Sequence, residues 1–163
     1  MSATTTTSTV LLEARGLGLS YGEAEILAGV DLEVRSGEVL ALVGPNGAGK
    51  TSLLSLLAGD IDPSSGSVLL DGRPVTAHKP TELARRRGVL LQENRLSFPF
   101  EVVEVVEMGR APWRGRPESY DDERAVAEAM AATDVVHLAR RLFPTLSGGE
   151  KSRVSFSRVL AQD

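Results

Sequence analysis

The chain has 163 residues, a formal net charge of −4 and 42% hydrophobic residues, which suits one globular domain and offers no electrostatic footprint for nucleic acid. It contains no cysteine, which excludes disulfide frameworks, thiolate zinc sites and cysteine nucleophiles. No apolar run approaches the roughly 18 residues of a membrane-spanning helix, so we expect a soluble, intracellular protein. Residues 1–9 are rich in threonine and lack positive charge, so they predict a disordered tail rather than a signal peptide.

Strand patterns dominate the first part of the chain. Residues 29–34 alternate apolar and polar side chains, as a half-buried strand does. The unbroken apolar run at 39–43 is typical of a strand covered on both faces in a parallel α/β sheet. The expected strands are 10–21, 29–34, 39–43, 67–70 and 88–91, and the expected helix is 50–58, with Gly59 as its stop.

Helical patterns dominate the second part. Apolar residues recur at roughly helical spacing over 102–108. Residues 121–132 are rich in alanine and open with three acids, which favour the positive end of a helix. A third helix is expected from the glycines at 148 and 149 to about residue 162. The loop between the first two helices contains Pro112, Trp113, Gly115 and Pro117.

The strongest motif is a complete G-x-x-x-x-G-K-T sequence between an expected strand and an expected helix. Its glycines let backbone N–H groups surround a phosphate at the helix N-terminus, where the helix dipole adds positive charge. Lys50 would reach the β- and γ-phosphates of a nucleotide, and the Thr51 hydroxyl would ligate Mg²⁺. The alternative is a glycine-rich turn that happens to precede a helix. The motif residues are Gly44, Pro45, Asn46, Gly47, Ala48, Gly49, Lys50 and Thr51.

A second motif, LSGGE, occupies residues 146–150. Ser147 followed three residues later by Glu150 is a capping box, which by itself only starts a helix. Two glycines at a helix N-terminus also expose N–H groups to an anion. Both interpretations can hold together, with a capped helix directed at a phosphate.

The two motifs together resemble those of the ABC ATPases. The run VLALVGPNGAGKTSLL at 39–54 is similar to that family's Walker A region, and Gln92 and the LSGG motif follow in the family's order and spacing. The resemblance covers nearly the whole chain from Leu11 onward. It implies an α/β P-loop NTPase core with an antiparallel β subdomain and an α-helical subdomain. The implied organisation is a tail at 1–9, an ATP-binding core at 10–93, a helical subdomain at 94–146, and the signature motif with its helix at 147–163.

The resemblance also implies roles for individual residues. Tyr21 would stack on adenine, although a strand-end aromatic without a function is the alternative. Gln92 would act at the catalytic centre by sensing Mg²⁺ and the attacking water. Glu150 replaces the family's usual glutamine, and we expect it to turn back and cap the helix because its charge would repel a triphosphate. The implied set for ATP and Mg²⁺ is Tyr21, Gly44 to Ser52, Gln92, Ser147, Gly148, Gly149 and Glu150, with Ser147 to Gly149 binding the γ-phosphate of ATP held by a second copy.

The stretch LSFPFEVVEVVEMGRAPW at 96–113 is similar to the helical subdomain of haemin and iron-chelate importer ATPases. This implies an energy-coupling subunit on the cytoplasmic face of the membrane, attached through permease subunits and without contact to the cargo. Phe98, Phe100 and Trp113 would either dock a permease helix or pack inside the helical subdomain.

Family members continue into a strand that ends in an Asp–Glu pair, which holds Mg²⁺ and polarises the attacking water. The sequence ends at Asp163, before such a strand, so we expect weak nucleotide binding and no measurable turnover from residues 1–163 alone. Two other functions stay open: an ABC ATPase without a transporter, and a non-catalytic nucleotide-binding fragment.

Overall fold

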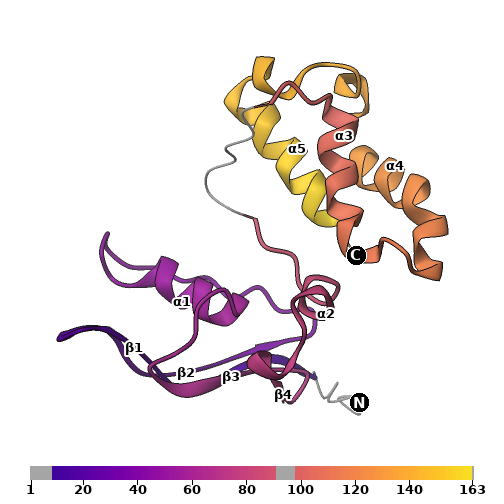
Figure 1. The fold of residues 1–163 in the computed structure, drawn as a ribbon. Helices are drawn as coiled ribbons and strands as arrows, with labels where there is room; N and C mark the ends of the chain where they lie inside the picture. The colour runs from indigo at the N-terminus through magenta and orange to yellow at the C-terminus, as the bar shows by residue number, and fades with distance from the viewer. Residues whose placement is uncertain (1–8, 91–97, 163) are drawn as a thin grey trace, which may run out of the picture. The chain divides into compact units, whose positions relative to one another are not determined.

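The computed structural model describes residues 9–90 and 98–162. The chain forms two compact units, Met1–Lys79 and Pro80–Asp163 (Figure 1). Most of the tail predicted at 1–9 lies outside the described residues, as does Gln92. The domain boundaries predicted after residues 93 and 146 were placed by sequence motifs, whereas these units are defined by compactness. The predicted boundaries therefore stay a prediction.

The first unit contains a four-stranded antiparallel sheet with strand order β2-β1-β3-β4. Its two long strands are joined by a two-residue turn, and Tyr21 pairs with Ala24 on either side of it. Asp71 and Gly72, between the two short strands, have φ angles of 49° and 75°, as a tight hairpin turn requires. The predicted antiparallel β subdomain is therefore confirmed. The strands are β1 (Val10–Tyr21), β2 (Ala24–Arg35), β3 (Ser65–Leu70) and β4 (Arg73–Pro74).

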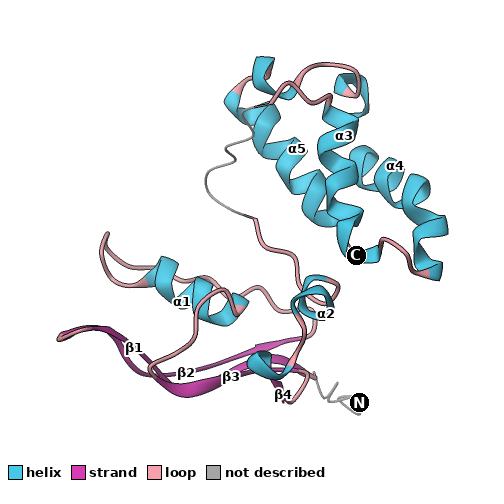
Figure 2. Cartoon of the chain, viewed as in Figure 1, coloured by secondary structure: helices cyan, strands magenta, loops and turns pink. Residues whose placement is uncertain are grey.

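One helix, α1 (Lys50–Ala58), lies against this sheet (Figure 2). Leucines on one side of α1 are buried, as are Leu17 and Leu19 of β1. Gly49 and Gly59 flank the helix, and both have the left-handed conformation that favours glycine. The helix predicted at 50–58 is confirmed at both ends.

The structure contradicts the strands predicted at 39–43 and 88–91. In the described part of the chain, residues 39–43 form no β-ladder, and Val39 and Val43 are 94% and 93% exposed. Residues 88–90 form no ladder either, and Leu91 lies outside the described residues. An apolar run becomes a buried strand only where neighbouring strands accept its hydrogen bonds and helices cover it. No described segment pairs with either run as a neighbouring strand.

The second unit is helical, as predicted. Its three main helices are α3, α4 and α5, which pack on one another. The helix predicted from 102 changes to a 3₁₀ helix at Met108, and the loop predicted around Trp113 is largely 3₁₀ helix. The elements are α2 (Pro80–Ala84), α3 (Val102–Glu107), η2 (Met108–Trp113), η3 (Pro117–Asp121), α4 (Asp122–Ala132), η4 (Val136–Leu138), η5 (Phe143–Thr145) and α5 (Gly148–Leu160).

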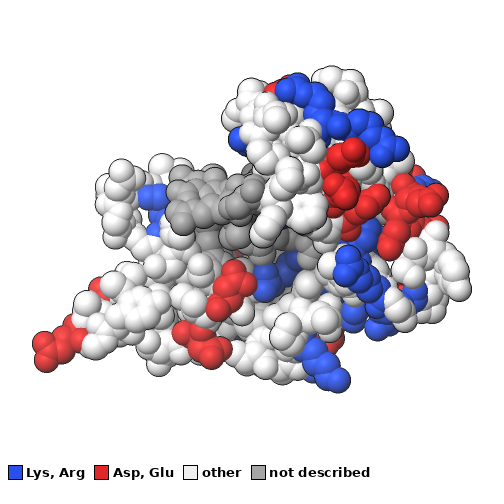
Figure 3. Space-filling view, turned by 45° about the horizontal axis from the view of Figure 1, so that its top comes forward, with Lys and Arg blue, Asp and Glu red and all other residues white. Residues whose placement is uncertain are grey.

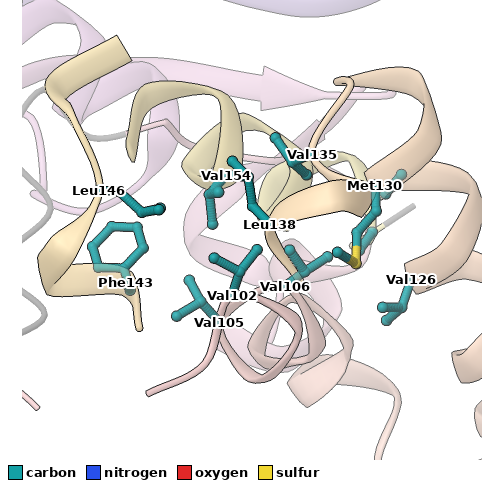
Figure 4. Close-up of a cluster of buried hydrophobic side chains, with 12 residues drawn as sticks. Val102, Val105, Val106, Val126, Met130, Val135, Leu138, Phe143, Leu146 and Val154 are labelled. Atoms are coloured by element: carbon teal, nitrogen blue, oxygen red, sulfur yellow. The ribbon is translucent and has the colours of Figure 1, made fainter. Parts of the chain in front are cut away.

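A cluster of buried apolar side chains holds this unit together (Figure 4). Valines at 102, 105 and 106 form its α3 side, and Phe143, Leu146 and Val154 connect it to the start of α5. Phe100 packs against the cluster from outside. The N-terminus of α5 is therefore anchored to the core through Phe143 and Leu146, which lie shortly before it in the chain.

The described surface carries both charge signs. On the face drawn in Figure 3, acidic and basic side chains of the helical unit lie next to one another. Among the described residues, no helix combines the length and the apolarity that crossing a membrane demands.

Candidate functional site

The glycine-rich loop leads into a helix that has no side-chain cap. Gly49 is the N-cap residue of α1, with φ 78°, and it provides no side-chain cap for the first turn. The first N–H groups of an α-helix have no acceptor within the helix. The N–H groups of Lys50, Thr51 and Ser52 are thus available to an anion at the positive end of the helix dipole. This arrangement fits the phosphates of a nucleotide.

Lys50 lies at the mouth of the same loop. Its ammonium group donates hydrogen bonds to the carbonyl oxygens of Gly44 at 2.8 Å and Pro45 at 2.6 Å. The side chain thereby folds back over the loop, which brings a positive charge beside the uncapped N–H groups. A phosphate oxygen, a stronger acceptor than a carbonyl, could take over these hydrogen bonds with little movement of the lysine.

The sheet supports the loop from β2. A Cβ atom on Gly49 would lie 2.8 Å from Cδ2 of Leu27 and 3.2 Å from the carbonyl oxygen of Ile26. Gly47 has φ 82° but open space around it. Gly49 is therefore required by close packing as well as by its backbone conformation, whereas Gly47 is required by conformation alone.

Tyr21 lies at the end of β1, paired with Ala24 of the same β2 strand that supports Gly49. Its side chain is 61% exposed. An aromatic ring that does not enter the core is available to stack on a flat ligand. The hairpin that carries Tyr21 and the phosphate-binding loop are thus both attached to β2.

The signature motif begins α5 with the predicted capping box. The Glu150 N–H donates to Ser147 Oγ at 3.3 Å, and the Ser147 N–H donates to Glu150 Oε2 at 2.7 Å. The Ser147 N–H is therefore occupied. The N–H groups of Gly148 and Gly149 remain for an anion, and the Ser147 hydroxyl would have to turn from the Glu150 carboxylate to join them.

Glu150 is also paired with a base. Arg141 Nη1 donates to Glu150 Oε1 at 3.1 Å. Hydrogen bonding with Ser147, through its side chain and then its main chain, holds the pKa of the Glu150 carboxyl below its ordinary value of 4.5, with a smaller contribution from the charge of Arg141. The carboxyl is therefore ionised and directed at its own helix, as expected from the sequence.

Of the three aromatic residues predicted to dock a partner or to pack internally, two pack within the helical unit. Trp113 is half-buried, and its indole N–H donates to the carbonyl oxygen of Gln162 at 2.8 Å. The guanidinium of Arg110 lies 5.1 Å from the centre of the same ring. Phe100 packs on the core, whereas Phe98 is 70% exposed. Phe98 is the most exposed of the three, and its ring meets that of Phe100 edge-on.

Sequence reasoning missed Arg110, Gly109 and Gln162. Arg110 is buried, bonds to Asp122 Oδ1 and to the carbonyl oxygen of Ala161, both at 2.8 Å, and so joins α4 to the end of α5. A Cβ on Gly109 would overlap the carbonyl oxygen of Arg158. The signal was the Met-Gly-Arg sequence itself, where a glycine inside a helical pattern indicates a close approach.

The metal part of the predicted site rests on Thr51 and Gln92, and Gln92 lies outside the described residues. In residues 9–90 and 98–162, no group of three His, Asp or Glu side chains could hold a metal ion. Magnesium beside a nucleotide usually has few protein ligands and is held largely by phosphate oxygens and water, and the pair Thr51 and Gln92 stays a prediction.

Comparison with known proteins places these features in a family. A family model described as ABC transporter matches residues 27–163. The chain is 59% identical over 157 residues to a hemin import ATP-binding protein of Thermobifida fusca, covering 96% of this chain and 55% of that protein. It is 58% identical over 153 residues to the protein of the same name from Streptomyces coelicolor, covering 94% and 55%. The chain thus spans about half the length of the curated relatives it matches.

A solved structure agrees with the fold. The cbiO1 protein of Clostridium perfringens, part of the ABC transporter complex cbiONQ, superimposes with a TM-score of 0.80 at 30% identity. The match covers 94% of this chain and 62% of that chain. The antiparallel sheet, the glycine-rich loop before α1 and the capped signature helix are therefore parts of a known architecture. The chain belongs to the ABC transporter family and forms part of its ATPase domain.

Proposed function

We propose that the protein is the energy-coupling subunit of an ABC importer, which binds Mg·ATP between two copies of itself and couples ATP hydrolysis to the uptake of haemin or another iron chelate. The observation that carries this proposal is the uncapped N-terminus of α1 beside the Lys50 ammonium. The relatives named hemin import ATP-binding proteins support the class of cargo.

ATP binding would use the groups of the first unit. The phosphates accept hydrogen bonds from the first turn of α1 and from Lys50, and the exposed ring of Tyr21 stacks on adenine. Thr51, together with Gln92, contributes oxygen ligands to Mg²⁺. The ion, when bound, neutralises charge that develops on the phosphates.

The signature motif would serve the other copy. Ser147, Gly148 and Gly149 offer their remaining donors to the γ-phosphate of ATP that the partner copy holds. Each site is then completed only in the dimer, so ATP binding and dimer formation stabilise each other. Hydrolysis removes the γ-phosphate and with it these contacts.

The permease subunits would hold the protein at the cytoplasmic face of the membrane. The resemblance of residues 96–113 to importer ATPases supports this contact, and the exposed ring of Phe98 is the side chain proposed to make it. An energy-coupling subunit placed in this way does not touch the cargo.

The test of nucleotide binding is Lys50→Ala in the intact protein, measured by calorimetry with Mg·ATP. A lysine–phosphate contact contributes about 2–3 kcal/mol, so the affinity should fall by roughly 100-fold. Lys79→Ala removes the same charge from an exposed position and is the matched control. Unchanged affinity in Lys50→Ala would refute the proposed site, and failure to co-purify with a membrane permease would refute the importer.

A further inference from the structure

The signature motif places a carboxylate beside the site proposed for a triphosphate. Glu150 is the third residue of α5, one turn after Ser147 and directly after the two glycines. Two negative groups about 5 Å apart repel each other strongly where water is partly excluded. Binding the phosphates of a second copy therefore requires that the charge of Glu150 be neutralised and its position be fixed.

Both oxygens of Glu150 have partners. Oε2 accepts the Ser147 N–H at 2.7 Å, and Oε1 accepts Arg141 Nη1 at 3.1 Å. The side chain of Glu150 is 21% exposed, against 48% for that of Arg141. The guanidinium thus lies on the solvent side of the carboxylate, which it holds against its own helix.

Arg141 is itself fixed by the fold. Its main-chain N–H donates to the carbonyl oxygen of Leu138 at 2.8 Å, and its carbonyl oxygen accepts the N–H of Val102 at 3.0 Å. Its Nη2 also reaches the carbonyl oxygen of Thr145 at 3.4 Å. Arg141 therefore connects the first residue of α3 to the turn that precedes the signature motif.

We propose that Arg141 is a positioning residue for the signature motif: it neutralises Glu150 and holds it away from the phosphate, so that Ser147, Gly148 and Gly149 can bind the γ-phosphate of ATP on a second copy. This inference rests on the proposed function and deepens it. It explains how a chain with glutamate at this position satisfies both the helix and an anionic ligand.

If Arg141 acts by neutralising Glu150, removing Arg141 should weaken the dimer only while residue 150 carries a charge. With glutamine at position 150, the side chain can still accept the Ser147 N–H, but no charge remains to be neutralised. If Arg141 served only to pack the turn, its removal would have the same effect with either residue at 150.

The experiment is a double-mutant cycle in the intact protein: wild type, Arg141→Ala, Glu150→Gln and the double variant. The readout is the dissociation constant of the dimer formed with Mg²⁺ and a non-hydrolysable ATP analogue, measured by sedimentation. Arg141→Ala should weaken the dimer roughly fivefold to tenfold at low salt, and about twofold or less at about 0.5 M salt. In the Glu150→Gln background the same change should alter the constant by less than about twofold.

Arg141→Lys retains the charge and should restore most of the lost affinity. If Arg141→Ala does not fold, Arg141→Lys takes its place in the cycle and should show dimer affinity close to that of the wild type. Equal loss in both backgrounds, or no loss in either, would overturn the role of Arg141 while leaving the proposed function intact. A wild-type protein that forms no dimer with the analogue would instead overturn the proposed function, and the inference with it.

Discussion

The indole N–H of Trp113 donates a hydrogen bond of 2.8 Å to the main-chain carbonyl oxygen of Gln162, a residue 49 positions later in the chain. Arg110 bonds to the adjacent carbonyl oxygen, that of Ala161, at 2.8 Å. The last carbonyl groups of a helix have no partner within it. Two side chains of η2 therefore cap the C-terminal end of α5, while Ser147 and Glu150 cap its N-terminal end.

Trp113→Phe should lower the free energy of unfolding of the intact protein by about 1 kcal/mol, because it removes one hydrogen bond and leaves the ring nearly in place. Urea denaturation monitored by circular dichroism measures the change. Tyr120→Phe is the control, since Tyr120 is 93% exposed and should show no effect. An unfolding free energy equal to that of the wild type would mean that the hydrogen bond from Trp113 to Gln162 does not stabilise the fold.

Gly109→Ala should cost about 3 kcal/mol, because the added Cβ would overlap the carbonyl oxygen of Arg158 and push η2 away from α5. Gly115→Ala provides the comparison. Gly115 has φ 74° but nothing within 4 Å of an added Cβ, so this change should cost only about 1 kcal/mol of backbone strain. Thermal unfolding of the two variants side by side gives the difference, and equal costs would contradict the close packing.

Gly49→Ala and Gly47→Ala form a matched pair in the phosphate-binding loop. Both positions have positive φ, but only Gly49 has Leu27 and Ile26 close by. Without nucleotide, Gly47→Ala should lower the unfolding free energy by about 1 kcal/mol and Gly49→Ala by about 2–3 kcal/mol. The reverse order in a nucleotide-free thermal melt would show that β2 does not support the loop.

Gly149→Ala should separate folding from function. An added Cβ meets nothing within 4 Å, and alanine favours a helix over glycine by roughly 0.5–1 kcal/mol, so the variant should be at least as stable as the wild type. The methyl group would nevertheless stand where the γ-phosphate is proposed to approach. Nucleotide-dependent dimerisation should therefore fall by about tenfold or more, and a fully retained dimer would place the phosphate elsewhere.

Acidification should weaken the signature helix through Glu150. The pKa of Glu150 is lowered in the folded protein, so the ionised carboxyl contributes stability above its unfolded value of 4.5 and loses this contribution as the pH falls through the lowered pKa. The stability difference between wild type and Glu150→Gln should thus be constant from about pH 7 to about pH 5 and shrink below 4.5. A difference that stays unchanged at low pH would indicate that the charge of Glu150 contributes nothing.

Local signals in the sequence were sufficient for α1 and for the start of α5. The helix at 50–58 is flanked by two glycines, and the capping box at Ser147 is written in two residues three positions apart, so each could be recognised without knowledge of the rest of the fold.

Features that depend on distant partners could not be predicted in this way. The run at 39–43 has the composition of a central strand, but a strand exists only with a neighbour, and no described segment pairs with it. The contacts of Arg110 and Arg141 join residues that are far apart in the chain or separated by a turn, and periodicity carries no information about such pairs. Gln92 stays a prediction because it lies outside the described residues.

The N-terminus of α1, which has no side-chain cap, affects the stability of the protein itself. A helix whose first donors lack partners is incomplete, and a bound phosphate would supply the missing acceptors. If ATP binds as proposed, it would also be a structural component of the first unit, so that depletion of nucleotide leaves this segment less resistant to unfolding and to proteases.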